Sequence, residues 1–181
     1  AFPSIRLTHP DLYALDVLSY VLTEGESSRL IRTVRDEGLV YSVSSLSWTP
    51  AWGRGMFAVT ARVAPDGLEK AKSAILEQVE RVRNELIDPE ELEQAKRQKM
   101  AELVFGLQTA EQVAENMAID YLTTGDIDFS RAYVDHIQDV TAEQVREVAR
   151  KYLDPERLAT LTILPEGFQS EAQQQARAAG L

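Results

Sequence analysis

The sequence contains no cysteine, and this absence excludes two kinds of site at once. Without thiols the chain forms neither a disulfide nor a thiolate metal site, so packing and hydrogen bonds must hold the fold together. A chain without cysteine suits a reducing or an oxidising compartment equally well. Its location therefore stays open between the cytoplasm and the periplasm.

Histidine is nearly absent as well, with His9 beside a proline and His136 in a helical stretch. A catalytic zinc usually needs three protein ligands, and the His-x-x-Glu-His run of one class of zinc peptidase does not occur here. We therefore assign no metal and no complete catalytic site to this chain. We expect His9 in a loop and His136 half-exposed on a helix.

Basic residues are in the minority: 19 lysines and arginines stand against 29 acidic residues, for a formal net charge of -10. This is the wrong sign for a surface that neutralises phosphates, so nucleic acid is not an expected partner. No apolar run approaches the ~20 residues that span a bilayer, and no basic-then-apolar leader opens the chain. We expect a soluble domain without a transmembrane segment.

What is present fits one domain of 181 residues with 44% hydrophobic content. The sequence opens on Ala1-Phe2-Pro3, which is typical of a strand entered partway, and we expect an excised piece of a longer polypeptide. The predicted domain covers residues 1–164. The alanine- and glutamine-rich stretch 165–181 is expected to be a poorly ordered tail.

Hydrophobic periodicity predicts a strand, two helices, a two-stranded hairpin, a run of helices and a last strand. Such segregation indicates an α+β fold, with one mainly antiparallel sheet covered on one face by several helices. The expected strands lie at 1–7, 39–48, 56–63 and 158–164, and the expected helices begin near residues 12, 28, 68, 89, 110, 129 and 142.

Three helix starts carry capping signatures. Thr109-Ala110-Glu111-Gln112 and Thr141-Ala142-Glu143-Gln144 both fit a capping box, in which the threonine and glutamine side chains satisfy each other's backbone N–H groups. Asp88 precedes a proline and is expected to cap the next helix, with Glu91 reaching back to it.

The stretch from Gly25 to Trp48 defines its own local structure. Ser27 or Ser28 can cap a short helix, and Gly38 is expected to end it in the left-handed conformation. From residue 39 the pattern changes to the alternation of a strand, which places Tyr41 on the same face as Val43.

Three arginines of this helix, Arg29, Arg32 and Arg35, are spaced three residues apart and repel one another unless an anion faces them. The alternative is a solvated charged face, because Asp36 and Glu37 lie nearby. Spacing alone leaves both interpretations open.

Read as a whole, the stretch resembles the non-catalytic C-terminal domain of peptidase family M16, the insulinase-like and mitochondrial-processing zinc peptidases. The resemblance extends more loosely over the rest of the chain. The matching residues are Gly25, Ser27, Ser28, Arg29, Leu30, Arg35, Gly38, Leu39, Tyr41, Ser42 and Val43.

The resemblance implies a two-layer half-domain that closes with a catalytic half around a peptide. Zinc, its ligands and the general base would come from that half, in the same chain or in a partner subunit. An arginine and a tyrosine at the positions of Arg35 and Tyr41 would reach the substrate. The family has one more residue between these two, so Arg32 is the alternative counterpart of the arginine.

Hydroxyl and guanidinium groups are both donors, so together they can bind a peptide carbonyl and the negative charge it gains when water attacks. The alternative for Tyr41 is a core aromatic residue at the sheet edge. For the whole domain, the alternative is a non-proteolytic assembly module of the same family. Trp48 and Trp52 are expected to pack at the hairpin end, with a peptide-binding platform as the other interpretation.

Overall fold

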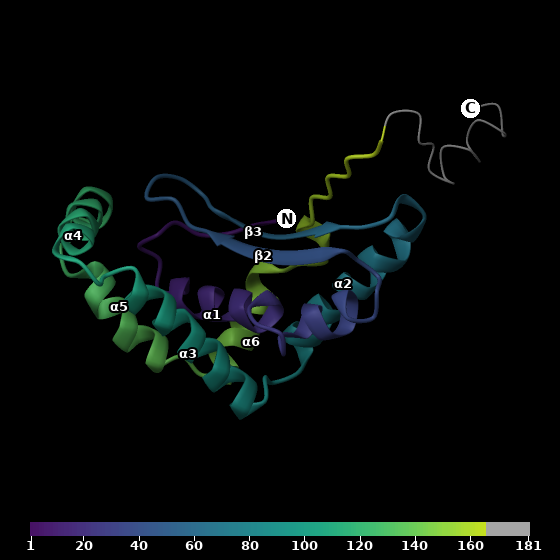
Figure 1. Cartoon of the computed structure of the whole chain (residues 1–181), viewed down its shortest axis with the longest axis horizontal. Helices are drawn as coiled ribbons and strands as arrows, with labels where there is room; N and C mark the ends of the chain where they lie inside the picture. The colour runs from purple at the N-terminus through teal and green to yellow at the C-terminus, as the bar shows by residue number, and fades with distance from the viewer. Residues whose placement is uncertain (166–181) are drawn as a thin grey trace.

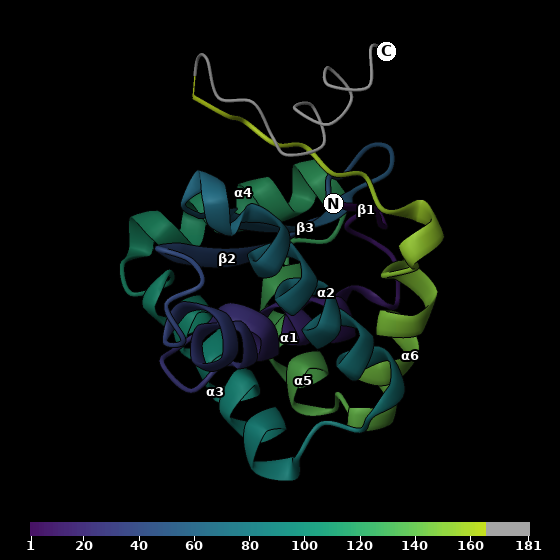
Figure 2. The same ribbon diagram turned by 90° about the vertical axis from the view of Figure 1, so that its right-hand side faces the viewer.

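The computed structural model describes residues 1–165 and contains a small antiparallel sheet with helices packed against one face. Its strands are β1 (Phe2–Pro3), β2 (Ser42–Trp48) and β3 (Met56–Arg62), in the order β1-β3-β2. Figure 1 shows α1, α2, α3 and α6 beneath the sheet, and Figure 2 shows the same layering from the side. The predicted α+β fold is confirmed.

The predicted helices are found close to their expected starts, and both threonine capping boxes are closed. In residues 1–165 no helix combines the length and the apolar character needed to cross a membrane. The α-helices are α1 (Leu12–Thr23), α2 (Leu68–Asn84), α3 (Pro89–Phe105), α4 (Ala110–Thr124), α5 (Phe129–Gln138) and α6 (Ala142–Tyr152), and the short turns are η1 (Ile31–Arg35), η2 (Pro65–Gly67) and η3 (Pro155–Arg157).

Helix α1 forms the centre of the core. Leu15, Leu18 and Leu22, which follow one another at helical spacing, are fully buried. The helix contacts β2 above and α3, α5 and α6 on its other sides. A helix surrounded in this way must be apolar nearly all round, and its sequence is. The stretch from Gly25 to Trp48, which follows α1, therefore starts from a helix that is held in the core.

The hairpin of β2 and β3 has one face toward the helices and one open face. Val43 and Phe57 point inward and are buried, whereas Leu46, Trp48 and Met56 stand on the open face and are about half-exposed or somewhat less. The predicted packing of Trp48 and Trp52 is wrong, because no helix of residues 1–165 covers the open face and the two residues are 50% and 80% exposed.

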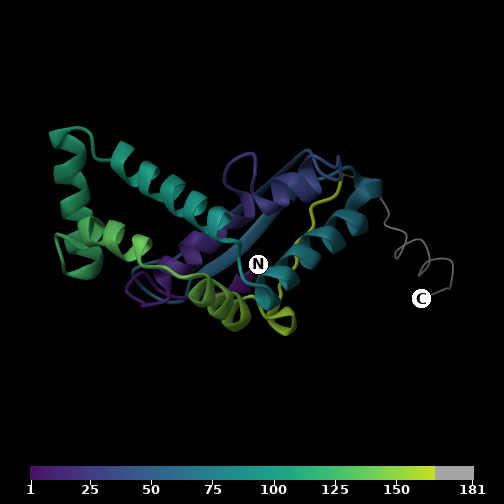
Figure 3. The same cartoon turned by 90° about the horizontal axis from the view of Figure 1, so that it is seen from below.

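Helices α3, α4 and α5 form an arm that extends away from the sheet, with α4 joining the far ends of the other two (Figure 3). Near the body, the Tyr133 hydroxyl of α5 donates a hydrogen bond to Asp16 of α1. Burial raises the pKa of Asp16. Farther out, Asp120 is the one buried residue of α4. The arm is therefore attached firmly at its base and thinly packed at its tip.

Both outer strands differ from their predictions. The first strand covers two residues instead of seven, and residues 158–164 form no strand. One backbone pair, Ala1 with Ala159, joins the two stretches. In a strand, every second residue forms backbone hydrogen bonds with a neighbouring strand. In the stretch 158–164 only Ala159 does so, and an alternating pattern without such bonds does not make a strand. The predicted tail beyond residue 165 lies outside the described residues.

Candidate functional site

The turn before the short helix is tied down on both sides. Both the backbone N–H and the hydroxyl of Ser28 donate to the carbonyl oxygen of Gly25, at 3.1 and 2.8 Å. The Ser27 hydroxyl accepts a hydrogen bond from Gln94 of α3. Neither serine caps the helix, so that prediction is wrong. These hydroxyls fix the turn to itself and to α3 instead.

The helix itself is short, and residues 31–35 form a π-helical turn, which is wider than an α-helical one. Its Asp36 N–H donates to the carbonyl oxygen of Ile31 at 2.9 Å, five residues back, which is the bonding of a π-turn. Leu30, Ile31 and Val34 lie at helical spacing and are buried. Wide turns of this kind are frequent at functional sites because they shift where side chains emerge.

The three arginines have three different environments. Arg29 points inward and forms a bidentate pair with Glu91 at the start of α3, with N–O distances of 2.7 and 2.8 Å. This hydrogen bonding raises the pKa of Arg29. Glu91 was predicted to reach back to Asp88, and that prediction is wrong, because Asp88 caps Glu90 and leaves Glu91 free for Arg29.

Arg35 and Arg32 lie at the surface. The Arg35 guanidinium pairs with Glu26 and with Asp36, and hydrogen bonding to the first raises its pKa. Arg32 is exposed and makes no ion pair with any residue in 1–165. The predicted mutual repulsion is thus relieved, because two arginines have carboxylate partners and one is solvated.

Gly38 closes the helix as predicted. Its φ of +70° is left-handed, its N–H donates to the carbonyl of Arg35, and the N–H of Leu39 donates to the carbonyl of Val34. These two bonds form a Schellman motif. A Cβ at position 38 would meet nothing within 4 Å, so the requirement for glycine comes from the backbone conformation alone.

Tyr41 is placed by an irregularity that the sequence pattern did not reveal. Ser42 is the register partner of Arg62, and the preceding N–H of Tyr41 also donates to the Arg62 carbonyl oxygen at 2.7 Å. Two successive residues opposite one is the arrangement of a β-bulge, which changes the direction of a side chain. Val40 is consequently buried and Tyr41 is 76% exposed, so the predicted face shared by Tyr41 and Val43 is wrong.

The corner therefore presents an exposed phenol beside a helix that carries two surface arginines. Neither arginine forms a hydrogen bond with Tyr41 within the described part of the chain, where the Tyr41 hydroxyl also has no partner. Phenol and guanidinium groups can donate to an oxyanion or a carbonyl that approaches from outside. Residues 1–165 contain no group of three or more potential ligand side chains that could hold a metal ion.

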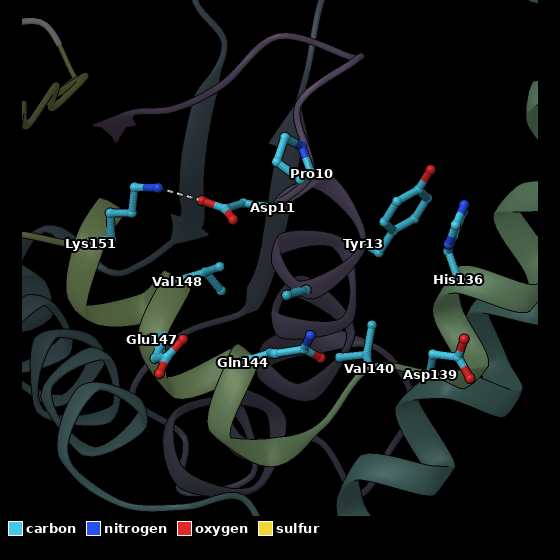
Figure 4. Close-up of a pocket in the computed structure, with 11 residues that line it drawn as sticks. Pro10, Asp11, Tyr13, His136, Asp139, Val140, Gln144, Glu147, Val148 and Lys151 are labelled. Atoms are coloured by element: carbon cyan, nitrogen blue, oxygen red, sulfur yellow. Dashed lines mark hydrogen bonds and ion pairs between the residues drawn. The ribbon is translucent and has the colours of Figure 1, made fainter.

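A pocket of about 380 Å³ lies elsewhere, between the start of α1, the end of α5 and α6 (Figure 4). At one side Asp11 accepts hydrogen bonds from Lys151 and Tyr152 at 2.7 and 2.6 Å. Burial opposes ionisation of Asp11, but these bonds outweigh it and lower its pKa. At the other side Tyr13 lies against the exposed ring of His136. This pocket contains none of the predicted site residues.

His9 is found in the loop where it was expected, and its Nδ1 accepts the N–H of Asp11 at 3.0 Å. It is therefore used to start α1. His136 is on α5, in a different part of the fold. The two histidines do not combine with other side chains into a zinc site within residues 1–165, so the residues present do not fit zinc.

Comparison with known proteins now adds to this geometry. The chain is 28% identical over 167 residues to an uncharacterized zinc protease of Bacillus subtilis, YmxG, covering 92% of this chain and 40% of that protein. The chain thus spans about two fifths of the length of this relative.

Two solved structures share the fold. A protease from Helicobacter pylori superposes with a TM-score of 0.77 at 25% identity, over 86% of this chain and 38% of that one. A peptidase M16 inactive domain from Pseudomonas fluorescens gives a TM-score of 0.74 at 21% identity, over 87% and 40% of the two chains. The family model described as the peptidase M16 inactive domain matches residues 1–99, more than half of the sequence. The chain therefore belongs to the family of peptidase M16 inactive domains.

Proposed function

We propose that this domain is the zinc-free half of an M16 zinc peptidase, and that it binds peptide substrate and stabilises the oxyanion through the exposed corner of Tyr41. The observation that carries the proposal is the bulge at Tyr41, which exposes 76% of a tyrosine that simple alternation would bury. Membership of the inactive-domain family and the zinc protease relative support the assignment of the zinc and the general base to another half.

The chain's own residues fix the backbone that carries Tyr41 before substrate arrives. The Schellman bonds at Gly38 fix the backbone before Tyr41, and the Arg62 carbonyl accepts the N–H of Tyr41 itself. The bidentate pair of Arg29 and Glu91 holds the preceding turn against α3. These bonds fix the backbone from which the Tyr41 side chain extends, and a donor on a fixed backbone needs less reorganisation when negative charge develops on a carbonyl oxygen.

An arginine is proposed to act with Tyr41. The two surface arginines differ in whether they must break an ion pair before they contact substrate. Arg35 must release Glu26 or Asp36 before it contacts substrate, whereas Arg32 has no carboxylate partner to release in the described residues. Surface ion pairs of this kind contribute little to stability, so substrate can displace them. We keep Arg35 as the first choice and Arg32 as the alternative.

The test uses the full-length parent protein or the assembled subunits, with a fluorogenic peptide. Tyr41→Phe should lower kcat/KM about tenfold or more, as loss of one transition-state donor does. Tyr121→Phe is the matched control, because Tyr121 is 61% exposed on α4 and the substitution removes only its hydroxyl and keeps the apolar ring, so it should leave the rate unchanged. Equal rates for both variants would contradict a donor role for Tyr41.

Arg32→Ala and Arg35→Ala separate the two arginines in the same assay. Substitution of the arginine that acts in the transition state should lower kcat, and substitution of the other arginine should leave kcat unchanged. The isolated domain with added zinc should not hydrolyse the peptide. Turnover by the isolated domain that a chelator abolishes would overturn the proposal, and a parent protein without any peptidase activity would favour the assembly-module alternative.

A further inference from the structure

The open face of the hairpin formed by β2 and β3 changes from polar to apolar along its length. Side chains of register partners in an antiparallel pair lie on the same face of the sheet. The partners on the open face, starting from the end near Tyr41, are Ser42 with Arg62, Ser44 with Thr60, Leu46 with Ala58, and Trp48 with Met56. The apolar end therefore presents Leu46, Trp48 and Met56, which we call the hairpin patch.

The hairpin patch is available to another molecule. Its three side chains are between 39% and 51% exposed, and no helix of residues 1–165 covers them, since the packed helices lie on the opposite side of the sheet (Figure 1). The backbone N–H and C=O groups of β2 and β3 lie in the plane of the sheet, so a molecule above the open face meets side chains only. Recognition at this face therefore depends on the character of the side chains that are bound.

The charge of the hairpin differs from that of the rest of the chain. Residues 38–64 contain two arginines and no acidic residue, although the whole chain carries 29 acidic residues. Arg62 lies at the polar end of the face, and Arg54 lies in the turn beyond the hairpin patch. Both are exposed, and neither forms an ion pair with another residue in 1–165. The face therefore suits an apolar segment with carboxylate neighbours better than one with lysine or arginine neighbours.

We propose that the hairpin patch is a second subsite for peptide substrate, and that it selects substrates with an apolar residue, flanked by acidic residues, about six positions from the bond that is cleaved. This subsite depends on the proposed function, in which the cleaved bond lies at Tyr41. Ser42, which follows Tyr41, and Trp48 lie on one strand and are about 20 Å apart at ~3.3 Å per residue. An extended peptide has the same rise per residue, so about six of its residues cover this distance.

A second copy of this chain fits the same face less well. In a symmetric dimer the same surface meets itself, so the arginines at the two ends of the face would be brought toward one another. Like charges across an interface oppose association. A peptide with carboxylates beside its apolar residue can instead pair with Arg54 or Arg62 while it covers the hairpin patch. The charges therefore favour the peptide over the second copy.

The experiment uses the full-length parent protein or the assembled subunits with fluorogenic peptides that are cleaved at one bond, as checked by mass spectrometry. The peptides differ at one position, about six residues from that bond, which holds phenylalanine or serine. The phenylalanine peptide should have a kcat/KM about fivefold higher or more, because its ring is removed from water on the hairpin patch. Trp48→Ser should reduce this ratio to about one, and an unchanged ratio would overturn the proposal.

Two further variants control for folding and for general loss of apolar surface. Leu46→Ser should also lower the ratio and keeps the test possible if Trp48→Ser does not assemble. Leu86→Ser is its matched control, because Leu86 is 47% exposed and Leu46 is 51% exposed, but Leu86 lies between α2 and α3. Leu86→Ser should keep the full preference for phenylalanine. Equal loss of the preference in both leucine variants would overturn the proposal.

A second peptide pair tests the charge preference. Aspartate in place of lysine beside the phenylalanine should raise kcat/KM about threefold at low salt, and added salt should weaken this preference. Arg54→Gln should reduce the preference. Arg131→Gln removes the same charge from an exposed position on α5 and should not reduce it. The same preference in all three proteins would overturn the acidic part of the proposal.

The results at Tyr41 and at the hairpin patch are separable. If Tyr41→Phe lowers the rate but no peptide shows a phenylalanine preference that depends on Trp48, the subsite is refuted and the donor role of Tyr41 stands. If the preference depends on Trp48 but Tyr41→Phe has no effect, the subsite stands without that donor. A dimer of the 181-residue chain that Trp48→Ser dissociates in analytical ultracentrifugation would assign the face to a second copy and overturn the proposal.

Discussion

Helices α4 and α6 begin with the same four residues, Thr-Ala-Glu-Gln, and close the same capping box, yet they occupy opposite environments. Helix α6 buries Val145, Val148, Ala149 and Tyr152 against α1 and α2. Helix α4 buries only Asp120 and contacts mainly α5. Local chemistry therefore decides where each helix starts, and the neighbouring helices decide what it buries.

The difference has a visible cause in the arrangement of the chain. Helix α6 lies against the body beneath the sheet, whereas α4 sits at the far end of the arm (Figures 1 and 3). Its apolar residues remain exposed, among them Met117, Ile119, Tyr121 and Leu122. Exposed apolar residues gathered on one part of a surface are typical of a contact site with another chain or domain.

A charge placed at the equivalent position of α6 and of α4 should give the largest difference in stability between the two helices. Val145→Asp puts a carboxylate into a site with no exposure, and it should lower the free energy of unfolding by about 4 kcal/mol or more. Val113→Asp, at a site 39% exposed, should change it by less than about 0.5 kcal/mol. Urea denaturation followed by circular dichroism measures both.

If Val145→Asp does not fold, Val145→Ala keeps the comparison measurable, with an expected loss of about 2 kcal/mol against almost none for Val113→Ala. Equal losses at positions 145 and 113 would mean that α4 is packed in solution as tightly as α6.

The sequence patterns predicted correctly those features that depend on residues close together in the sequence. Capping at Thr109 and Thr141 and the closure at Gly38 depend on residues within one turn, so the sequence alone predicted them. In β3 Phe57 is buried while its neighbour Met56 is exposed, so the alternation of that strand is unbroken.

The failures have causes that lie far away in the sequence. Residues 158–164 alternate like a strand, but the partner strand needed for a ladder is missing from the described structure. At the site, Arg29 finds Glu91 across 62 residues, a pairing that no local pattern signals. The bulge at Tyr41 shifts the alternation by one residue, and only the Arg62 carbonyl reveals it. The spacing of the two valines was a signal of the bulge, since Val40 and Val43 are three residues apart and cannot both be buried on one face of a regular strand.

Removing the one buried anchor of α4 should sharpen the comparison. The Asp120 carboxylate accepts the N–H and the hydroxyl of Ser130, both at 2.8 Å, and so caps the start of α5. Asp120→Ala should cost about 1–2 kcal/mol in the opening of the arm, because loss of a cap leaves a backbone N–H without its partner. Hydrogen exchange of α4 and α5 amides measures this opening.

Glu115→Ala is the matched control for Asp120→Ala, since Glu115 is exposed on the same helix and its side chain forms no hydrogen bond with residues 1–165. It should leave exchange in α5 unchanged. Equal exchange in both variants would show that packing, and not the carboxylate of Asp120, joins α4 to α5.

The smallest effect tests the two capping boxes against each other. Thr109→Ala and Thr141→Ala each remove the same cap, a hydroxyl that accepts an N–H at 3.2 Å, and each should destabilise its helix start by about 1 kcal/mol. Because α6 belongs to the core, the loss at Thr141 should appear in the global free energy of unfolding. The loss at Thr109 should instead appear as roughly fivefold faster amide exchange confined to α4, since the arm tip can open while the core stays folded. An equal global loss for both variants would mean that arm and core unfold as one cooperative unit, and the contrast between α4 and α6 would then concern solvent exposure alone.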